Sequence, residues 1–386
     1  MKKYKIVFIS KESIGGTTTY LNQINLLNPK KFEKLLLLFK KEDIDQIEMR
    51  KEYLGYDYPK NDFGFSIPKL GIFIRNFCKL YLKVVKEKPD LILTRDQYSL
   101  VMGHLLKKVF FKKIVFVCQI NNNLEKILES KTKLHAFVLK TFITLSLNNY
   151  DLLMYSSEDL KMFIQQKFKI RNKKAIVLFP AVDFKRIRKL AKQGLETLYE
   201  EHLLQKNSSF KIFSVGTLNF QKDFSTIIKA FSILRKKRAD AELFIIGDGI
   251  LKEELKREAK SLGVEKQTHF LGWKKNVFSY LKFADLFLFA SNYEGLGVVL
   301  VEAMVMGIPV VVTDTPFGPS EILEKGKYGI LVPIGNYKKM AEYAKLLIED
   351  KKLREKYKRL GLKRTNDYNV ELVIKKTENL FLSLLK

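Results

Sequence analysis

The sequence predicts an α/β protein built from two doubly wound domains that face a central cleft. Short apolar runs, typical of buried parallel strands, alternate with stretches of helical periodicity along most of the chain. This alternation weakens between residues 180 and 209, where polar residues gather, and it resumes at residue 210. A chain of 386 residues is long enough for two domains, since one domain usually holds roughly 100–200 residues. We therefore expect a first domain over residues 1–185 and a second over residues 205–369.

The clearest βαβ unit lies in the second half of the chain. Residues 284–290 form an apolar run typical of a buried strand, and residues 310–313 form another. A helix is predicted between them over residues 298–306, and Gly307 with Pro309 ends it. The turn before this helix lies at the carboxyl end of a strand, where open α/β sheets bind ligands. Its glycines allow close approach of a ligand, and the helix start offers free amides that suit a phosphate.

Two glutamates frame this turn. Glu294 lies in the turn itself, and Glu302 lies eight residues further on, within the predicted helix. Were both helical, they would be about 12 Å apart along the axis, whereas the carboxylates of a retaining glycosidase are roughly 5 Å apart. The spacing instead suits two carboxylates that hold different parts of one long ligand. The alternative is a helix-capping Glu294 and a solvated Glu302, but the apolar neighbours Val301 and Met304 argue against solvation of Glu302.

The first half of the chain begins with a predicted buried strand over residues 3–10. Gly15 and Gly16 follow this strand, and Thr17 can cap a helix over residues 18–27. This arrangement again places free amides at the carboxyl end of a strand. The alternation continues with strands at 34–39, 89–94, 114–118, 151–156 and 175–178, and helices at 68–88 and 101–109.

The second half follows the same plan from residue 210 onward. A strand over residues 210–216 leads through the turn 217–223 to a helix over residues 225–234. A strand over residues 241–246 ends at the turn Gly247-Asp248-Gly249. The later elements are strands at 268–273 and 328–332 and two long helices at the end of the chain.

The sequence gives no sign of a metal site or a disulfide framework. Asp43 and Asp45 are spaced like a metal-binding pair, but they open an amphipathic helix, where the helix dipole favours acidic residues. No cluster of cysteine and histidine has the spacing of metal ligands. The two cysteines, Cys78 and Cys118, indicate a reduced, cytoplasmic setting.

The charge of the chain points to an anionic partner. The formal net charge is +28, of which residues 1–190 contribute +19 and the remaining residues +9. Nucleic acid, anionic lipid and phosphates are the partners that such a charge attracts. The alternative is a lysine-rich composition without a function, although composition alone does not explain the excess in the first half. An aromatic-basic RNA motif and a recognition helix are both absent, which argues against nucleic acid.

A membrane surface is one anionic partner that the sequence suggests. Residues 107–113 interleave four lysines with two phenylalanines, a pattern typical of a membrane-surface patch. The alternative is a helix end with snorkelling lysines and two core aromatics. The sequence shows neither a signal peptide nor an apolar run of the roughly 20 residues that span a bilayer. We expect a cytoplasmic protein that is peripheral at the inner face of the cell membrane.

Several motifs together resemble the signature of family-4 retaining glycosyltransferases, also called group 1. They are Glu294-Gly295-x-Gly297, Glu302-Ala303-Met304, Gly307-x-Pro309-Val310-Val311 and Thr313-Asp314. The resemblance implies the GT-B fold, in which a C-terminal helix, here about 370–386, packs back on the first domain. It implies transfer of a sugar from a UDP- or GDP-sugar donor, without a further cofactor or a metal. The acceptor would be a glycan or a lipid-linked glycan in cell-surface polysaccharide biosynthesis.

The resemblance also implies roles for individual residues. Lys222 would contact the donor diphosphate, Glu294 the hydroxyls of the donor sugar, and Glu302 the ribose. Further substrate contacts would come from Gly15, Gly16, Gly216, Gly295 and the amides of Leu296, Gly297 and Val298. Three positions depart from the family pattern. Thr217 stands where an arginine is usual, Asn121 or Gln119 is the nearest counterpart of a usual histidine, and Phe179 replaces a usual asparagine.

Two other functions remain open at this point. One is a GT-B relative with different chemistry, such as a nucleotide-sugar epimerase or a phosphorylase. A phosphorylase would need a lysine that carries pyridoxal phosphate, and no residue is identified for that role. The other is a basic nucleic-acid-binding protein, against which the missing motifs argue.

Overall fold

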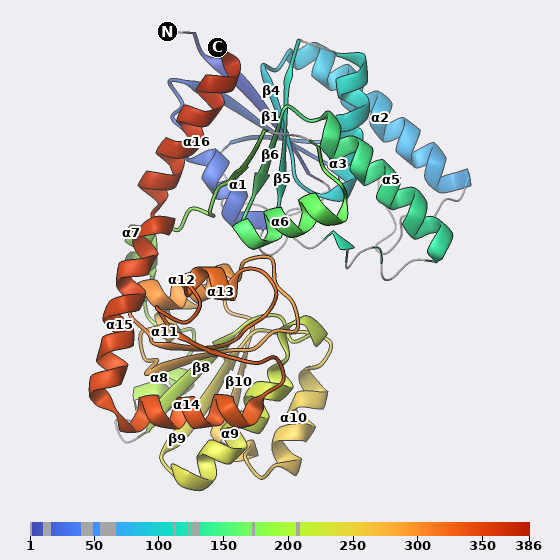
Figure 1. The fold of residues 1–386 in the computed structure, drawn as a ribbon. Coiled ribbons are helices and arrows are strands. Elements are labelled where there is room, and N and C mark those ends of the chain that lie inside the picture. The colour runs from blue at the N-terminus through green and yellow to red at the C-terminus, as the bar shows by residue number, and fades with distance from the viewer. Residues whose placement is uncertain are drawn as a thin grey trace. The chain divides into compact units, whose positions relative to one another are not determined.

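The computed structural model divides the chain into two compact units, each with one parallel sheet (Figure 1). Unit 1 consists of Met1–Ala181 with Val370–Lys386, and unit 2 consists of Val182–Asn369. The structure describes residues 2–10, 17–39, 49–54, 67–110, 113–121, 124–125, 128, 132–171, 174–205 and 209–386. Two helix-covered parallel sheets confirm the predicted α/β class. The predicted turn at Gly15 and Gly16 lies outside the described residues, as do Asp43 and Asp45.

The sheet of unit 1 has seven strands in the order β3-β2-β1-β4-β5-β6-β7, and its neighbouring strands run parallel. The strands are β1 (Tyr4–Ser10), β2 (Phe32–Leu38), β3 (Arg50–Tyr53), β4 (Leu91–Thr94), β5 (Val115–Ile120), β6 (Leu152–Tyr155) and β7 (Ala175–Val177). The helices include α1 (Thr17–Asn25), α2 (Ile67–Glu87), α3 (Gln97–Val109), α5 (Lys133–Asn149), α6 (Glu158–Lys167) and α16 (Val370–Leu385). Because the strands are parallel, their carboxyl ends meet at one edge of the sheet.

The last helix of the chain completes unit 1. Helix α16 lies beside α1 (Figure 1). Its Val373 and Phe381 are buried in the same core cluster as residues of β1 and α1. The Gln23 side chain on α1 donates a hydrogen bond from Nε2 to Thr377 Oγ1 on α16 at 3.1 Å. Apolar burial and this buried hydrogen bond hold the final helix on the first sheet.

The sheet of unit 2 has six parallel strands in the order β10-β9-β8-β11-β12-β13. They are β8 (Phe210–Val215), β9 (Ala241–Ile246), β10 (Thr268–Gly272), β11 (Leu286–Phe289), β12 (Val310–Thr313) and β13 (Ile330–Val332). The α-helices are α7 (Phe184–Ala191), α8 (Leu198–Gln205), α9 (Phe224–Lys237), α10 (Lys252–Ser261), α11 (Phe278–Leu281), α12 (Val298–Val305), α13 (Pro319–Ile322), α14 (Tyr337–Glu349) and α15 (Lys351–Thr365). Short 3₁₀ helices lie at η1 (Phe220–Lys222), η2 (Glu265–Gln267) and η3 (Asn366–Tyr368).

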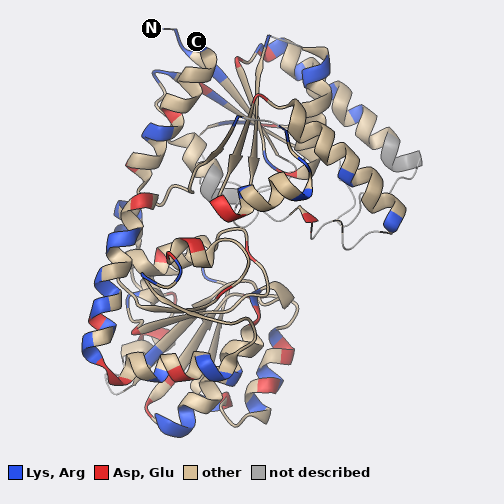
Figure 2. Ribbon diagram, in the orientation of Figure 1, with Lys and Arg blue, Asp and Glu red and all other residues tan. Residues whose placement is uncertain are grey.

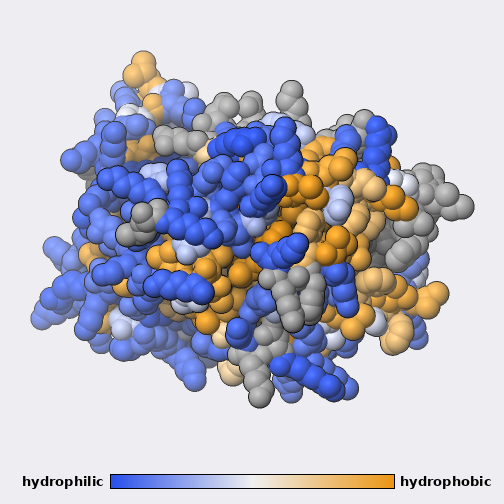
Figure 3. All heavy atoms as spheres, turned by 90° about the horizontal axis from the view of Figure 1, so that it is seen from above, coloured by the Kyte–Doolittle hydropathy of each residue, from blue (hydrophilic) through white to orange (hydrophobic). Residues whose placement is uncertain are grey.

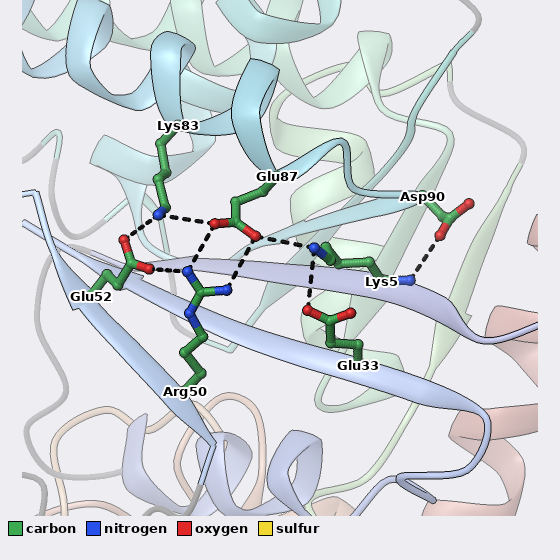
Figure 4. A network of polar contacts seen from close by, with 7 residues as sticks. All are labelled: Lys5, Glu33, Arg50, Glu52, Lys83, Glu87 and Asp90. Carbon is green, nitrogen blue, oxygen red and sulfur yellow. Dashed lines mark hydrogen bonds and ion pairs between the residues drawn. The ribbon is translucent and has the colours of Figure 1, made fainter.

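A network of charged side chains joins the amino-terminal ends of β1 and β3 to the last turn of α2 (Figure 4). Its centre is the Glu87 carboxylate, whose side chain is only 5% exposed. The cationic groups of Lys5, Arg50 and Lys83 lie 3.1, 3.0 and 3.0 Å from its oxygens. Burial alone would raise the pKa of Glu87, but hydrogen bonds from Lys83 and Lys5 outweigh it and lower the pKa from 4.5 to about 2.

This network predicts a loss of stability in acid. Because the folded-state pKa of Glu87 is depressed, its contribution is complete above about pH 4.5 and is lost as the pH falls toward 2. We expect Glu87→Gln to lower the free energy of unfolding at pH 7 by about 2 kcal/mol, since several charge-assisted hydrogen bonds are weakened. Thermal unfolding of both proteins between pH 7 and pH 3 should show the difference shrinking. A difference independent of pH would contradict the assignment.

The predicted lysine-phenylalanine patch over residues 107–113 is wrong for its first lysine. Lys107 is buried, and its Nζ lies 2.5 Å from Asp151 Oδ1. The ring of Phe110 stacks on Tyr81 of α2 with centroids 5.5 Å apart. Other members are Lys108 and Lys113, which are exposed, and Phe111 and Lys112, which lie outside the described residues. Lys107 therefore has a structural partner and is not available to a membrane surface.

Candidate active site

The strand order of unit 2 marks a switch point between β8 and β11. From β8 the chain proceeds to β9 and β10 on one side, and then to β11 and β12 on the other. Ligands bind open α/β sheets at the carboxyl ends of the strands that flank such a point. Two loops leave the sheet there, residues 216–223 after β8 and residues 290–297 after β11.

Lys222 and Glu294 come from these two loops and meet directly. Lys222 Nζ lies 2.5 Å from Glu294 Oε1, and the same oxygen accepts a 2.7 Å hydrogen bond from Ser291 Oγ. The Glu294 side chain is 5% exposed, so its charge is largely removed from water. The Lys222 ammonium also lies 5.0 Å from the centroid of the Phe289 ring. The pair places a cation and a carboxylate at the switch point.

Backbone contacts tie the two loops into one unit. Asn292 N donates to Gln221 O at 2.8 Å, and its side-chain Nδ2 donates to Phe220 O at 2.7 Å. In return, Gln221 Nε2 donates to Tyr293 O at 3.2 Å. These contacts fix the backbone on both sides of the ion pair before any ligand arrives, which is the property that electrostatic catalysis requires.

A second set of hydrogen bonds anchors the loop after β11. Ser291 N donates to Thr313 Oγ1 at 2.8 Å, and Thr313 Oγ1 donates to Ser291 O at 3.1 Å. Sequence reasoning missed both residues as parts of the site. The signal that could have identified Ser291 is its position three residues before Glu294, where a hydroxyl can reach the carboxylate.

The turn that begins α12 depends on two glycines. Gly297 precedes the helix with φ 83°, a left-handed conformation that favours glycine. A Cβ at Gly318 would lie 2.4 Å from the carbonyl oxygen of Leu296, so the loop after β12 packs tightly on this turn. Within the described residues, the amides of Leu296, Gly297 and Val298 donate to no other group. They form a set of free donors at a helix N-terminus, suited to an anion.

Glu302 lies in the second turn of α12 and is partly buried. Burial raises the pKa of Glu302 to about 7, and the charge of Arg186 on α7 acts in the opposite direction. No hydrogen bond or ion pair to its carboxylate is present in the part of the chain that the structure describes. The carboxyl group can therefore accept or donate a hydrogen bond to a ligand.

The loop after β8 has a close neighbour in the turn after β9. Gly216 N donates to Ile246 O at 3.0 Å, and a Cβ at Gly247 would lie 1.9 Å from Gly216 O. Leu218 N also donates to Asp248 O at 3.0 Å. Thr217 between these contacts is exposed. The backbone of Gly216 is thus held rigidly, with the exposed Thr217 beside it.

Of the residues predicted for the site, the structure brings Lys222 and Glu294 into contact, and Glu302 lies on α12, the helix that follows the second loop. Asn121 belongs to unit 1, where it follows β5. It is buried, and neither polar atom of its side chain has a hydrogen-bond partner. Gly15 and Gly16 are outside the described residues. Among the residues that the structure describes, no group of three His, Cys, Asp or Glu could hold a metal ion.

Comparisons with known proteins agree on a sugar-transferring family. The model of the family Glycosyl transferases group 1 matches residues 197–364. An uncharacterized glycosyltransferase of Methanocaldococcus jannaschii is 30% identical over 329 residues, which cover 76% of this chain and 80% of that protein. An N-acetylgalactosamine-N,N'-diacetylbacillosaminyl-diphospho-undecaprenol 4-alpha-N-acetylgalactosaminyltransferase of Campylobacter jejuni is 28% identical over 93% of both chains.

A solved structure shares the whole fold. The crystal structure of Anabaena HepE in complex with UDP superimposes with a TM-score of 0.80 at 19% identity, covering 98% of this chain and 100% of that one. This likeness confirms the predicted GT-B fold, and the match to the Methanocaldococcus protein extends over most of both chains.

Proposed function

The chain belongs to the group 1 glycosyltransferases, and we propose that it transfers a sugar from a nucleotide diphosphate donor to a lipid-linked glycan with retention of configuration. The observation that carries this proposal is the Lys222–Glu294 pair at the switch point of unit 2, beside the free amides of residues 296–298. A UDP- or GDP-sugar is the donor. UDP is the first nucleotide to test, because HepE was crystallised with it. No further cofactor is proposed.

The difficult part of the reaction is charge separation. As the bond to the donor sugar breaks, positive charge grows on the sugar and negative charge grows on the leaving diphosphate. The Lys222 ammonium and the amides of Leu296, Gly297 and Val298 would stabilise that negative charge without reorganising. Glu294 would accept hydrogen bonds from the hydroxyls of the donor sugar. In this proposal the leaving phosphate takes the proton of the acceptor, since no protein nucleophile is assigned.

The acceptor class rests on relatives. The Campylobacter enzyme is named for a diphospho-undecaprenol acceptor and an alpha linkage, and its likeness spans 93% of this chain. We propose the same class of acceptor here, in cell-surface polysaccharide biosynthesis at the inner face of the cell membrane. Within the part of the chain that the structure describes, no helix is long and apolar enough to cross a membrane.

A panel of UDP- and GDP-sugars, each with and without an undecaprenyl-diphosphate-linked glycan, tests the function. We expect release of free nucleotide only when both substrates are present, and an anomeric signal in the product that matches the donor. Conversion of the donor in the absence of acceptor would instead identify an epimerase. An inverted anomeric centre would overturn the retaining mechanism.

The role proposed for Glu302 predicts a pH-dependent affinity for nucleotide. Because burial raises the pKa of Glu302 to about 7, its carboxylate forms as the pH rises from 6 to 8. The ionised group should bind the ribose by a charge-assisted hydrogen bond of about 1.5–3 kcal/mol, or roughly ten- to a hundredfold in affinity. Calorimetry should show the affinity ratio of wild type to Glu302→Gln for UDP or GDP increasing across this range. Titration of the nucleotide phosphate affects both proteins equally, so it does not change this ratio. A ratio that stays constant with pH would refute the ribose contact.

A further inference from the structure

Helix α5 of unit 1 presents an apolar face to solvent. Four apolar residues, spaced so that they lie on one side of the helix, are each between 43% and 72% exposed. They are Leu134, Phe137, Phe142 and Leu145. The opposite side of α5 is buried through residues such as Leu139 and Ile143. A surface helix normally shows mainly polar residues on its outer side. Two phenylalanines and two leucines there, alongside the exposed Thr141 and Asn148, are therefore unusual. We call these four residues the α5 face.

Helix α2 of the same unit also carries exposed apolar residues. Helix α3 lies between α2 and α5 (Figure 1), and Asn76 of α2 donates a 2.8 Å hydrogen bond to Tyr98 of α3. On α2, Ile74, Leu82 and Val85 are exposed. The space-filling view shows hydrophobic residues gathered on its right-hand side, where α2 and α5 lie in Figure 1 (Figure 3). The three helices belong to unit 1, so the surface does not depend on how the units are arranged.

The exposed charges described on helices α2, α3 and α5 are all positive. In Figure 2 the ribbons of unit 1 carry basic residues in blue and acidic residues in red. Helices α2, α3 and α5 contain a single acidic residue, Glu87, which is buried in its ion pairs (Figure 4). Among the described side chains of these helices, the exposed basic residues are Arg75, Lys86, Lys108 and Lys133. Exposed apolar and basic side chains on three helices whose described residues include no exposed acidic residue complement a surface of negative headgroups over hydrocarbon.

We propose that the α5 face inserts into an anionic lipid bilayer and docks the protein on the membrane. The leucines and phenylalanines enter the boundary between headgroups and acyl chains, and the basic residues contact the anionic headgroups. This inference rests on the proposed lipid-linked acceptor. It replaces the predicted 107–113 patch as the docking element, because Lys107 is occupied by Asp151.

The topology of unit 1 gives the docked helix a suitable place. Strand β5 ends at Ile120, and α5 begins at Lys133 and runs back to the start of β6 at Leu152. The chain therefore leaves the carboxyl edge of the sheet before it enters the beginning of α5, which carries Leu134 and Phe137. Asn121, with its unpartnered side chain, lies at that same edge. A membrane contacted by the start of α5 would present a lipid-linked acceptor on this side of unit 1.

Co-sedimentation of the full chain with vesicles tests the proposal. The probes are vesicles of phosphatidylcholine alone and vesicles in which about a third of the lipid is phosphatidylglycerol. We expect wild type to bind the anionic vesicles at low salt, and part of the binding to survive raised salt, because burial of apolar side chains is not screened. The double variant Leu134→Ser/Phe137→Ser should bind at least tenfold more weakly and lose the salt-resistant part.

A matched control variant removes an exposed leucine and an exposed aromatic residue from unit 2. Leu198 and Tyr199 on α8 of unit 2 are 82% and 72% exposed, so Leu198→Ser/Tyr199→Ser should bind vesicles like wild type. Circular dichroism and calorimetric nucleotide binding establish that both variants are folded. Because this assay contains no substrate, its result does not depend on whether the protein transfers a sugar.

Three results would overturn the proposal. Wild type that ignores anionic vesicles at low salt would exclude docking. Equal binding by Leu134→Ser/Phe137→Ser and wild type would place the contact elsewhere. Light scattering that shows a dimer of wild type, dispersed by Leu134→Ser/Phe137→Ser, would make the α5 face an interface between two copies of the chain.

Discussion

Replacing Lys222 by alanine should lower the turnover number at least a hundredfold. Removal of one preorganised donor to a developing negative charge typically costs about 10²–10³ in turnover. The family resemblance predicts an arginine at the position of the exposed Thr217, so Lys222 would carry more of the diphosphate charge. The ammonium is held in place by Glu294 at 2.5 Å and by the Phe289 ring, which fixes its direction before the donor binds.

Steady-state kinetics with the donor and acceptor identified by the panel provide the measurement. Lys229→Ala is a matched control, because Lys229 on α9 also forms an ion pair with a glutamate, at 3.3 Å from Glu258, outside the two loops. The turnover number of Lys229→Ala should stay within about twofold of wild type, because a surface ion pair contributes little energy. A loss of less than tenfold for Lys222→Ala would show that another cation stabilises the leaving group.

The βαβ units were predictable because their signals are local. The helix predicted over residues 298–306 is found at Val298–Val305, and the strand predicted over residues 310–313 is found at Val310–Thr313. Apolar runs and glycine stops within ten residues determine both elements. The strand β3 was not predicted, because Arg50–Tyr53 is mostly charged. Its charges are neutralised by α2, a helix whose position no local pattern reveals (Figure 4).

The parts of the site that sequence reasoning missed depend on contacts between distant segments. Thr313 anchors Ser291 across 22 residues, and Asn292 reaches Phe220 across 72. Lys107 was misjudged for the same reason, since Asp151 lies 44 residues away. The weak pattern between residues 180 and 209 contains two short helices, α7 and α8. In α8 the usual pattern is reversed, because Glu200 is buried while Leu198 and Tyr199 are exposed. Parallel sheets make such long-range contacts the rule, because each strand pairs across a crossover.

Replacing Glu294 by alanine should nearly abolish transfer and leave the affinity for the free nucleotide almost unchanged. The Glu294 carboxylate lies between Lys222 and Ser291, and it would hold the donor sugar rather than the nucleotide. Its removal withdraws the acceptor for the sugar hydroxyls and also releases Lys222 from its position. Loss of both effects should reduce turnover by about a thousandfold or more, beyond the cost of one lost donor.

Comparison with Glu302 makes this expectation specific. Calorimetry with the free nucleotide should show a large loss of affinity for Glu302→Ala and a loss of less than about threefold for Glu294→Ala. Glu294→Gln keeps the shape of the side chain and an oxygen that Ser291 can reach, so it separates loss of charge from loss of packing. If Glu294→Gln retained most of the turnover, position rather than charge would be what Glu294 supplies. Equal losses of nucleotide affinity in Glu294→Ala and Glu302→Ala would show that the two carboxylates do not divide the donor between sugar and ribose.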